Sequence, residues 1–109
     1  MYLIKGTDIP KSDILYKVSN PIQAQKNAIK YLGKNIVLYK SSKPTHKYMI
    51  LDLLSNKCVH FGSIEYEDML KHQNKKRQTN YLARASNIKG NWKDNKYSSN
   101  NLSMNILWK

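Results

Sequence analysis

Three short apolar segments follow one another in the middle of the chain, and each is rich in β-branched or aromatic residues. They cover residues 36–39, 48–51 and 58–61. Ser41–Pro44 separates the first two, a turn at Ser55–Lys57 separates the last two, and Gly62 closes the third. This composition is typical of strands, and connections this short join antiparallel neighbours. The segments therefore predict a three-stranded antiparallel meander at about 36–61, around which the rest of the fold must be arranged.

A helix is expected directly before the meander, over residues 21–32. Asn20 is a favourable N-cap, Pro21 suits the first helical turn, and Gly33 suits the C-terminal stop. Between these ends, apolar residues recur at near-helical spacing: Ile22, Ala28, Ile29 and Leu32. Residues 1–20 are expected to form an N-terminal arm, in which residues 2–4 are a short edge strand that ends before Pro10.

After Gly62 the apolar pattern changes from a strand period to a helical period. A helix is expected from Ser63 through about Gln73, with its acidic residues near the N-terminus, and a longer one over residues 75–85. Trp92 and Trp108 carry large apolar areas, so we expect both to be anchors, buried in the domain or against a partner. The prediction is an α+β fold, a small three-stranded antiparallel meander with packed helices. It forms one small domain, 21–109, after the arm, 1–20.

The chain is strongly basic, and the charge is concentrated in its last third. Nineteen Lys and Arg against seven Asp and Glu give a net charge of +12, with a pI of about 9.8. Residues 1–70 have a net charge of +4, whereas residues 71–109 have nine cations and only Asp94, a net of +8. Such a field attracts nucleic acid or an acidic protein surface. The contact residues expected are Lys71, Lys75, Lys76, Arg77, Arg84, Lys89, Lys93 and Lys96.

Two features favour a different interpretation of this charge. Seventeen of the nineteen cations are Lys, which is a hydrated point charge and not the planar fork that reads bases. The chain also has twelve Asn, and Lys and Asn share A-rich codons. Part of the basic charge can therefore reflect an AT-rich genome, with the lysines forming a merely solvated face.

No motif for catalysis or metal binding is present. The chain lacks the glycine-rich loops that cradle nucleotide phosphates. Cys58 and His60 share one face of a predicted strand, but a zinc site needs about four ligands and no second pair follows. Glu65, Glu67 and Asp68 are clustered, yet on one helical turn they point partly apart, which disfavours a two-metal nuclease. We expect no enzyme, no cofactor and no metal, and the single cysteine cannot form an internal disulfide.

The most organised polar residues lie between 66 and 84. Arg77, Tyr81 and Arg84 follow i, i+4, i+7 and would line one face of the predicted helix. This face could contact phosphates, with an aromatic ring beside two guanidinium groups. Alternatively, Asp68 pairs with Arg77 or Arg84 inside a structural network. The members expected in this polar network are Tyr66, Asp68, His72 and Tyr81.

The order of these residues resembles a family of small basic proteins of unknown function encoded by large DNA viruses. The resemblance covers residues 46–108, and it rests on short motifs: Lys47-Tyr48, Val59–Gly62, Tyr66–Asp68, His72, Arg77, Tyr81–Arg84, Trp92 and Ile106–Trp108. The chain departs from the family pattern at Ala85, where the family usually has His, and it lacks an acid shortly before Trp92. The resemblance implies a viral source and no particular activity.

The functional prediction combines this source with the charge. No apolar run approaches the ~20 residues of a membrane helix, and the start lacks the apolar region of a signal peptide. We expect a small basic structural protein of the virion, made in the host cytoplasm, that cements capsid subunits or contacts the packaged genome. The alternative is a non-structural viral protein that binds nucleic acid. The expected partners are capsid proteins or other virion subunits, and the DNA or RNA backbone, with no small-molecule substrate evident.

Overall fold

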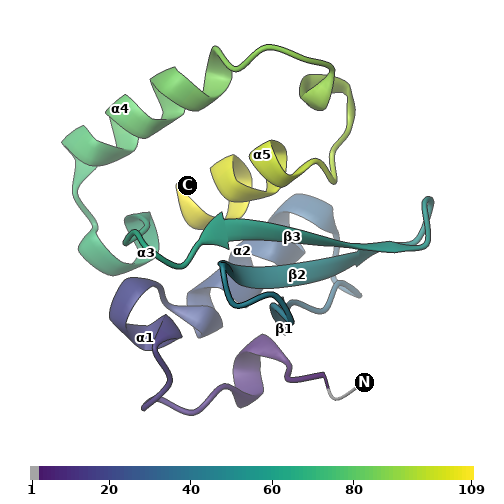
Figure 1. Cartoon of the computed structure of the whole chain (residues 1–109), viewed down its shortest axis with the longest axis vertical. Coiled ribbons are helices and arrows are strands. Elements are labelled where there is room, and N and C mark those ends of the chain that lie inside the picture. Colours follow the sequence, from purple (N-terminus) through teal and green to yellow (C-terminus); the bar gives the residue numbers. More distant parts are fainter. Residues whose placement is uncertain (1–2) are drawn as a thin grey trace.

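The structure, a computed structural model, describes residues 3–109 and contains a three-stranded antiparallel sheet packed with helices (Figure 1). The strands are β1 (Tyr39–Lys40), β2 (His46–Asp52) and β3 (Lys57–Ser63), in the order β1-β2-β3. The helices are α1 (Leu15–Val18), α2 (Pro21–Leu32), α3 (Met69–His72), α4 (Lys75–Ser86) and α5 (Ser99–Leu102). The predicted α+β class and the antiparallel meander are confirmed. No helix within residues 3–109 is long and apolar enough to cross a membrane.

The first strand is much shorter than predicted, because most of segment 36–39 is bonded elsewhere. The side chain of Gln25 on α2 donates to the carbonyl of Ile36 at 2.9 Å and accepts from the N–H of Leu38 at 2.8 Å. The N–H of Gly6 donates to the carbonyl of Leu38, also at 2.8 Å. These backbone groups are therefore satisfied outside the sheet ladder, and only Tyr39 and Lys40 pair with β2.

Helix α2 has the bounds that its end signals predict. The side chain of Asn20 accepts a hydrogen bond from the N–H of Gln23, and Gly33 ends the helix with a φ of +126°. Its buried face includes Asn27, whose amide donates to the carbonyl of Ile106 at 2.8 Å. The helix is thus joined to the C-terminal segment as well as to the segment that precedes β1.

Residues 3–20 pack on the same core. Ile9 and Leu15 are buried in it, and the carbonyl of Ile4 accepts from the N–H of Lys40 at 2.8 Å. A single antiparallel bridge joins Lys5 to β1. The edge strand predicted at residues 2–4 lies partly outside the described residues, because the description begins at residue 3.

The prediction that a helix begins at Ser63 is wrong. Strand β3 continues through Ser63, a loop follows, and α3 begins only at Met69. The carboxylate of Asp68 accepts from the N–H of Leu70 at 3.0 Å, so this acid caps the helix from outside. Gln73 then takes a left-handed conformation that separates α3 from α4, and α4 confirms the helix predicted over 75–85.

The C-terminal segment completes the core. It continues from α5 into a single π-helical turn, Ser103–Leu107, and lies between α4 and β3 (Figure 1). The core joins apolar side chains from α2, from the sheet and from this segment. Its members include Ala24, Ala28, Leu38, Tyr48, Ile50, Phe61, Leu102, Ile106, Leu107 and Trp108.

Candidate functional site

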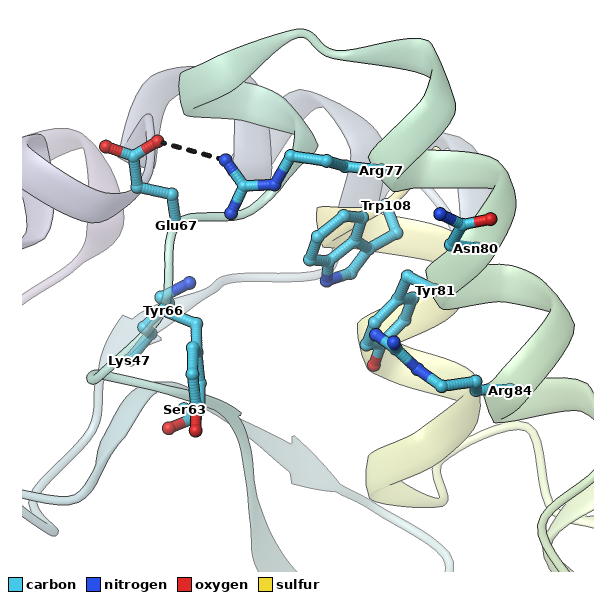
Figure 2. A pocket seen from close by; sticks show the side chains of 9 residues that line it. All are labelled: Lys47, Ser63, Tyr66, Glu67, Arg77, Asn80, Tyr81, Arg84 and Trp108. Atoms are coloured by element: carbon cyan, nitrogen blue, oxygen red, sulfur yellow. Dashed lines mark ion pairs between the residues drawn. The ribbon is translucent and has the colours of Figure 1, made fainter.

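A pocket of about 570 Å³ lies between the loop after β3 and helix α4. Figure 2 labels the nine side chains that line it, with Ser63 and Tyr66 on the loop side and Tyr81, Arg84 and Trp108 on the opposite side. Both arginines of the chain are among the nine, and both lie on α4, seven residues apart. The pocket is therefore where the guanidinium groups and several aromatic rings of this protein come together.

Helix α4 supplies one wall of the pocket. Arg77, Tyr81 and Arg84 are spaced so that they share one helical face, and all three line the pocket. Asn74 holds the start of the helix, because its side chain accepts from the N–H of Arg77 at 3.1 Å. The two arginines and the tyrosine are thus carried on a regular element rather than on a loop.

The Trp108 ring packs behind Tyr81 in this wall of the pocket. Its ring stacks on Tyr81 with centroids 4.1 Å apart and planes 9° apart, and the His72 ring lies 5.1 Å away. Its carbonyl accepts from the side-chain amide of Gln78 at 2.8 Å. Trp108 is buried, so the stacked pair is fixed in place before any ligand arrives.

A buried ion pair lies beneath the pocket. The Lys47 amino group is 3.1 Å from the Asp68 carboxylate, and both side chains are almost completely shielded from solvent. Burial lowers the pKa of Lys47 and raises the pKa of Asp68, while the opposite charge of each partner works against both shifts. The pair joins β2 to the start of α3, and it leaves little net charge at the base of the pocket.

The network predicted around Asp68 is therefore arranged differently from the expectation. Asp68 pairs with neither Arg77 nor Arg84, because it is buried as the cap of α3 and pairs with Lys47, while both arginines are exposed on α4. Arg77 instead has a long, solvent-exposed contact of 3.7 Å with Glu67. Within residues 3–109, Arg84 forms no salt bridge.

His72 lies next to this site and does not line the pocket. Its Nδ1 accepts from the N–H of Asn74 at 2.9 Å, which leaves the proton of the neutral ring on Nε2. Nε2 is buried and has no hydrogen-bond partner within residues 3–109. Burial, followed by the charge of Arg77, lowers the pKa of His72, so its neutral form is favoured.

The remaining predicted contact residues surround the pocket or lie beyond it. Lys71, Lys75, Lys76 and Lys89 are exposed on or near α3 and α4. Lys93 and Lys96 are also exposed, and their amino groups lie over the rings of Trp92 and Tyr31 at 5.6 and 5.1 Å. Trp92 is half-buried and donates to the Ile88 carbonyl at 2.6 Å, so it packs in the connection between α4 and α5. The two tryptophans thus have different environments.

Cys58 and His60 do not form a metal site. Cys58 is exposed on β3, and Nδ1 of His60 lies 2.7 Å from the hydroxyl of Ser41. In the described part of the chain, no group of three or more His, Cys, Asp or Glu side chains could hold a metal ion. His60 is therefore hydrogen-bonded within the protein, whereas Cys58 faces solvent.

Four residues that line the pocket were not among the predicted site residues: Lys47, Ser63, Glu67 and Asn80. Glu67 lies in the acidic cluster with Glu65 and Asp68 that was considered only as a nuclease site. Lys47 had a recognisable signal, because it directly precedes the apolar residues of a predicted strand and so must lie among buried neighbours. Asn80 and Ser63 had none, since each is an ordinary polar residue whose position depends on how α4 packs against the loop after β3.

The comparisons with known proteins concern the middle of the chain. Residues 36–85 match the profile of a family of unknown function, DUF5754. No curated protein and no solved structure matches the chain. The match confirms a resemblance to a family without a known function, over 36–85 rather than 46–108, and the viral source stays a prediction. The matched segment contains the whole sheet and every residue that lines the pocket except Trp108.

Proposed function

We propose that this protein binds single-stranded nucleic acid on the face formed by the pocket and the exposed lysines of α3 and α4. The observation that carries this proposal is the position of both arginines at one pocket whose walls hold aromatic rings. Guanidinium groups bind phosphate oxygens, and aromatic rings stack on unpaired bases. No catalytic step is part of this proposal.

The charge around the pocket favours a polyanion. Arg84 has no salt bridge within residues 3–109, and the contact of Arg77 with Glu67 is long and exposed. Lys71, Lys75 and Lys76 are exposed along the same part of the chain, which has the net charge of +8. Phosphate contacts of this kind position a strand and carry no sequence information, so we expect little sequence preference.

Salt dependence of binding tests the proposal. A labelled 20-nucleotide thymidine strand should bind with an affinity that falls linearly in log–log terms as salt rises. Changing Lys75, Lys76 and Arg77 together to Gln should reduce the slope by about one unit for each phosphate contact that is lost. Fluorescence anisotropy at several salt concentrations measures both quantities.

A variant with the same loss of charge elsewhere is the control. Lys26, Lys30 and Lys34 are exposed on and just after α2, and none lines the pocket. Changing these three to Gln should leave the slope near the wild-type value. If both triple variants lose the same affinity, only net charge matters and the proposed face is wrong. Absence of binding at low salt would remove the proposal altogether.

A second candidate function is the structural role in a virion, and the tip of the β2–β3 hairpin favours it. Leu53 and Leu54 are 76% and 96% exposed there, and Leu51 is also exposed. Exposed leucines of this kind are what a neighbouring protein subunit would bury. Mass spectrometry of purified particles tests this role: a constant ratio to the main capsid protein supports it, and absence from the particles rules it out.

A further inference from the structure

The shape of the pocket says more about the ligand than its charge alone. Tyr66 is 65% exposed and lines the pocket across from the stacked pair of Tyr81 and Trp108 (Figure 2). The volume of about 570 Å³ is in the range of pockets that bind a small ligand. A flat ring placed there would have an aromatic side chain on either side of it.

The two arginines lie on either side of this aromatic position. Tyr81 lies between Arg77 and Arg84 on α4, and the two arginine positions are separated by about 10.5 Å along the helix axis, at about 1.5 Å per residue. Each side chain lines the pocket. A base held against Tyr81 would therefore have one guanidinium group toward each end of its own nucleotide.

We propose that the pocket holds one unstacked base between Tyr66 and the Tyr81–Trp108 pair, with the phosphates on its two sides contacted by Arg77 and Arg84. This inference rests on the proposed function, and it names the part of the strand that the site recognises. The ligand chemistry is one nucleotide that carries phosphate on both its 5′ and 3′ sides. Such a nucleotide could belong to a strand or be free in solution.

The first experiment compares two strands of equal charge. One is the 20-nucleotide thymidine strand, and the other has the same phosphates and sugars without bases. At a fixed salt concentration, the wild-type protein should bind the base-bearing strand about 5- to 100-fold more tightly, because only this strand can stack. Equal affinity for the two strands would overturn the inference while leaving the proposed function in place.

The substitution Tyr66→Ala identifies the pocket in the same experiment. Tyr66 is exposed, so its removal should leave the melting temperature near the wild-type value. The preference for the base-bearing strand should fall toward one, whereas Tyr66→Phe keeps the ring and should keep the preference. If Tyr66→Ala lowers binding of both strands equally, or Tyr66→Phe loses the preference as well, stacking on this ring is not the cause and the inference fails.

The second experiment separates a strand from a free nucleotide. A Trp92→Phe background leaves Trp108 as the single tryptophan, and its fluorescence reports on the pocket. Thymidine 3′,5′-bisphosphate should quench it at lower concentration than thymidine or inorganic phosphate, and the thymidine strand should compete. Quenching by the bisphosphate without any strand binding would support the nucleotide pocket and overturn the strand-binding function. No quenching by any of these probes would overturn the inference.

Discussion

Trp108 contributes to the stability of the fold and to the candidate site at once. Its ring stacks on Tyr81, and its backbone carbonyl accepts from the side chain of Gln78. Its backbone N–H donates to the carbonyl of Ser103 at 3.1 Å. The residue thereby joins α4 to the C-terminal segment. An indole in this position supports the wall of the pocket from behind, so a change here affects packing before it affects binding.

We expect Trp108→Ala to lower the free energy of unfolding by about 3–5 kcal/mol, because it removes a large buried ring and leaves a cavity. Urea denaturation followed by circular dichroism measures this change. Trp92→Ala is the matched control, since Trp92 is only half-buried, and it should cost clearly less. A Trp108 variant as stable as the wild-type protein would contradict the assignment of its ring to the core.

At the scale of the elements, the end of β3 depends on one glycine. Gly62 has a φ of +79°, and a Cβ added there would lie 2.7 Å from a methyl carbon of Leu107. The close approach lets β3 pack against the C-terminal segment directly before the loop that carries Tyr66. The position therefore sets the geometry of the loop side of the pocket.

We expect Gly62→Ala to destabilise the protein by roughly 1–3 kcal/mol, from the strained φ and the overpacked contact together. The measurement is again the free energy of unfolding. Gly33→Ala is the comparison, because its φ is also positive but nothing lies within 4 Å of an added Cβ. The difference in unfolding free energy between the two variants is the cost of the contact between the added Cβ and Leu107. An equal cost for both variants would show that this contact is unimportant.

The helices also show why some elements could be predicted and one could not. Asn20 as N-cap and the apolar residues after it lie close together, so local sequence was sufficient to predict α2. Helix α4 was predicted from the helical spacing of its residues alone. The start of α3 was placed too early because acids such as Glu65 suit the first turn of a helix. Asp68 in fact caps the helix from outside, and it is held there by Lys47, twenty-one residues earlier in the chain. That pairing depends on packing between elements, which local sequence does not contain.

At the scale of the whole molecule, one part of the candidate site follows from local sequence, and the other depends on packing between distant segments. The common face of Arg77, Tyr81 and Arg84 follows from helical spacing, so the sequence was sufficient to predict it. The stacking of Trp108 on Tyr81 joins residues 27 positions apart and arises only once the C-terminal segment has packed. A tryptophan near one end of the sequence indicates that it must be buried, but not against which ring.

Two histidines make the stability of the whole molecule depend on pH. Burial, followed by the charge of Lys43, lowers the pKa of His60, and burial followed by Arg77 lowers that of His72. The unfolded chain, with histidine pKa values near 6.5, then binds more protons than the folded protein just below that pH. The contribution of the neutral histidines is complete above about pH 6.5 and is lost as the pH falls through the lowered folded-state values.

We therefore expect the melting temperature to fall as the pH is lowered from about 7 to 5.5, above the range in which ordinary carboxylates titrate. Differential scanning calorimetry at several pH values measures this dependence. In a variant with His60→Gln and His72→Gln, the melting temperature should vary less over the same interval. An equal or steeper dependence on pH in this double variant would contradict the direction of both histidine pKa shifts, since the raised pKa of Asp68 is common to both proteins.

The hydrogen bonds that shorten β1 also cover the backbone groups at this edge of the sheet. An edge strand with free N–H and C=O groups is a template on which another copy can add a strand. Here the backbone of residues 36–40 is occupied by the amide of Gln25, by Gly6 and by Ile4. On the opposite side of the sheet, the hydroxyl of Ser99 donates to the carbonyl of His60 on β3. Gln25 and the segment before α1 thus keep these backbone groups from pairing with another molecule. A chain without them would expose an edge strand on which a second copy could add a strand, and this would favour aggregation.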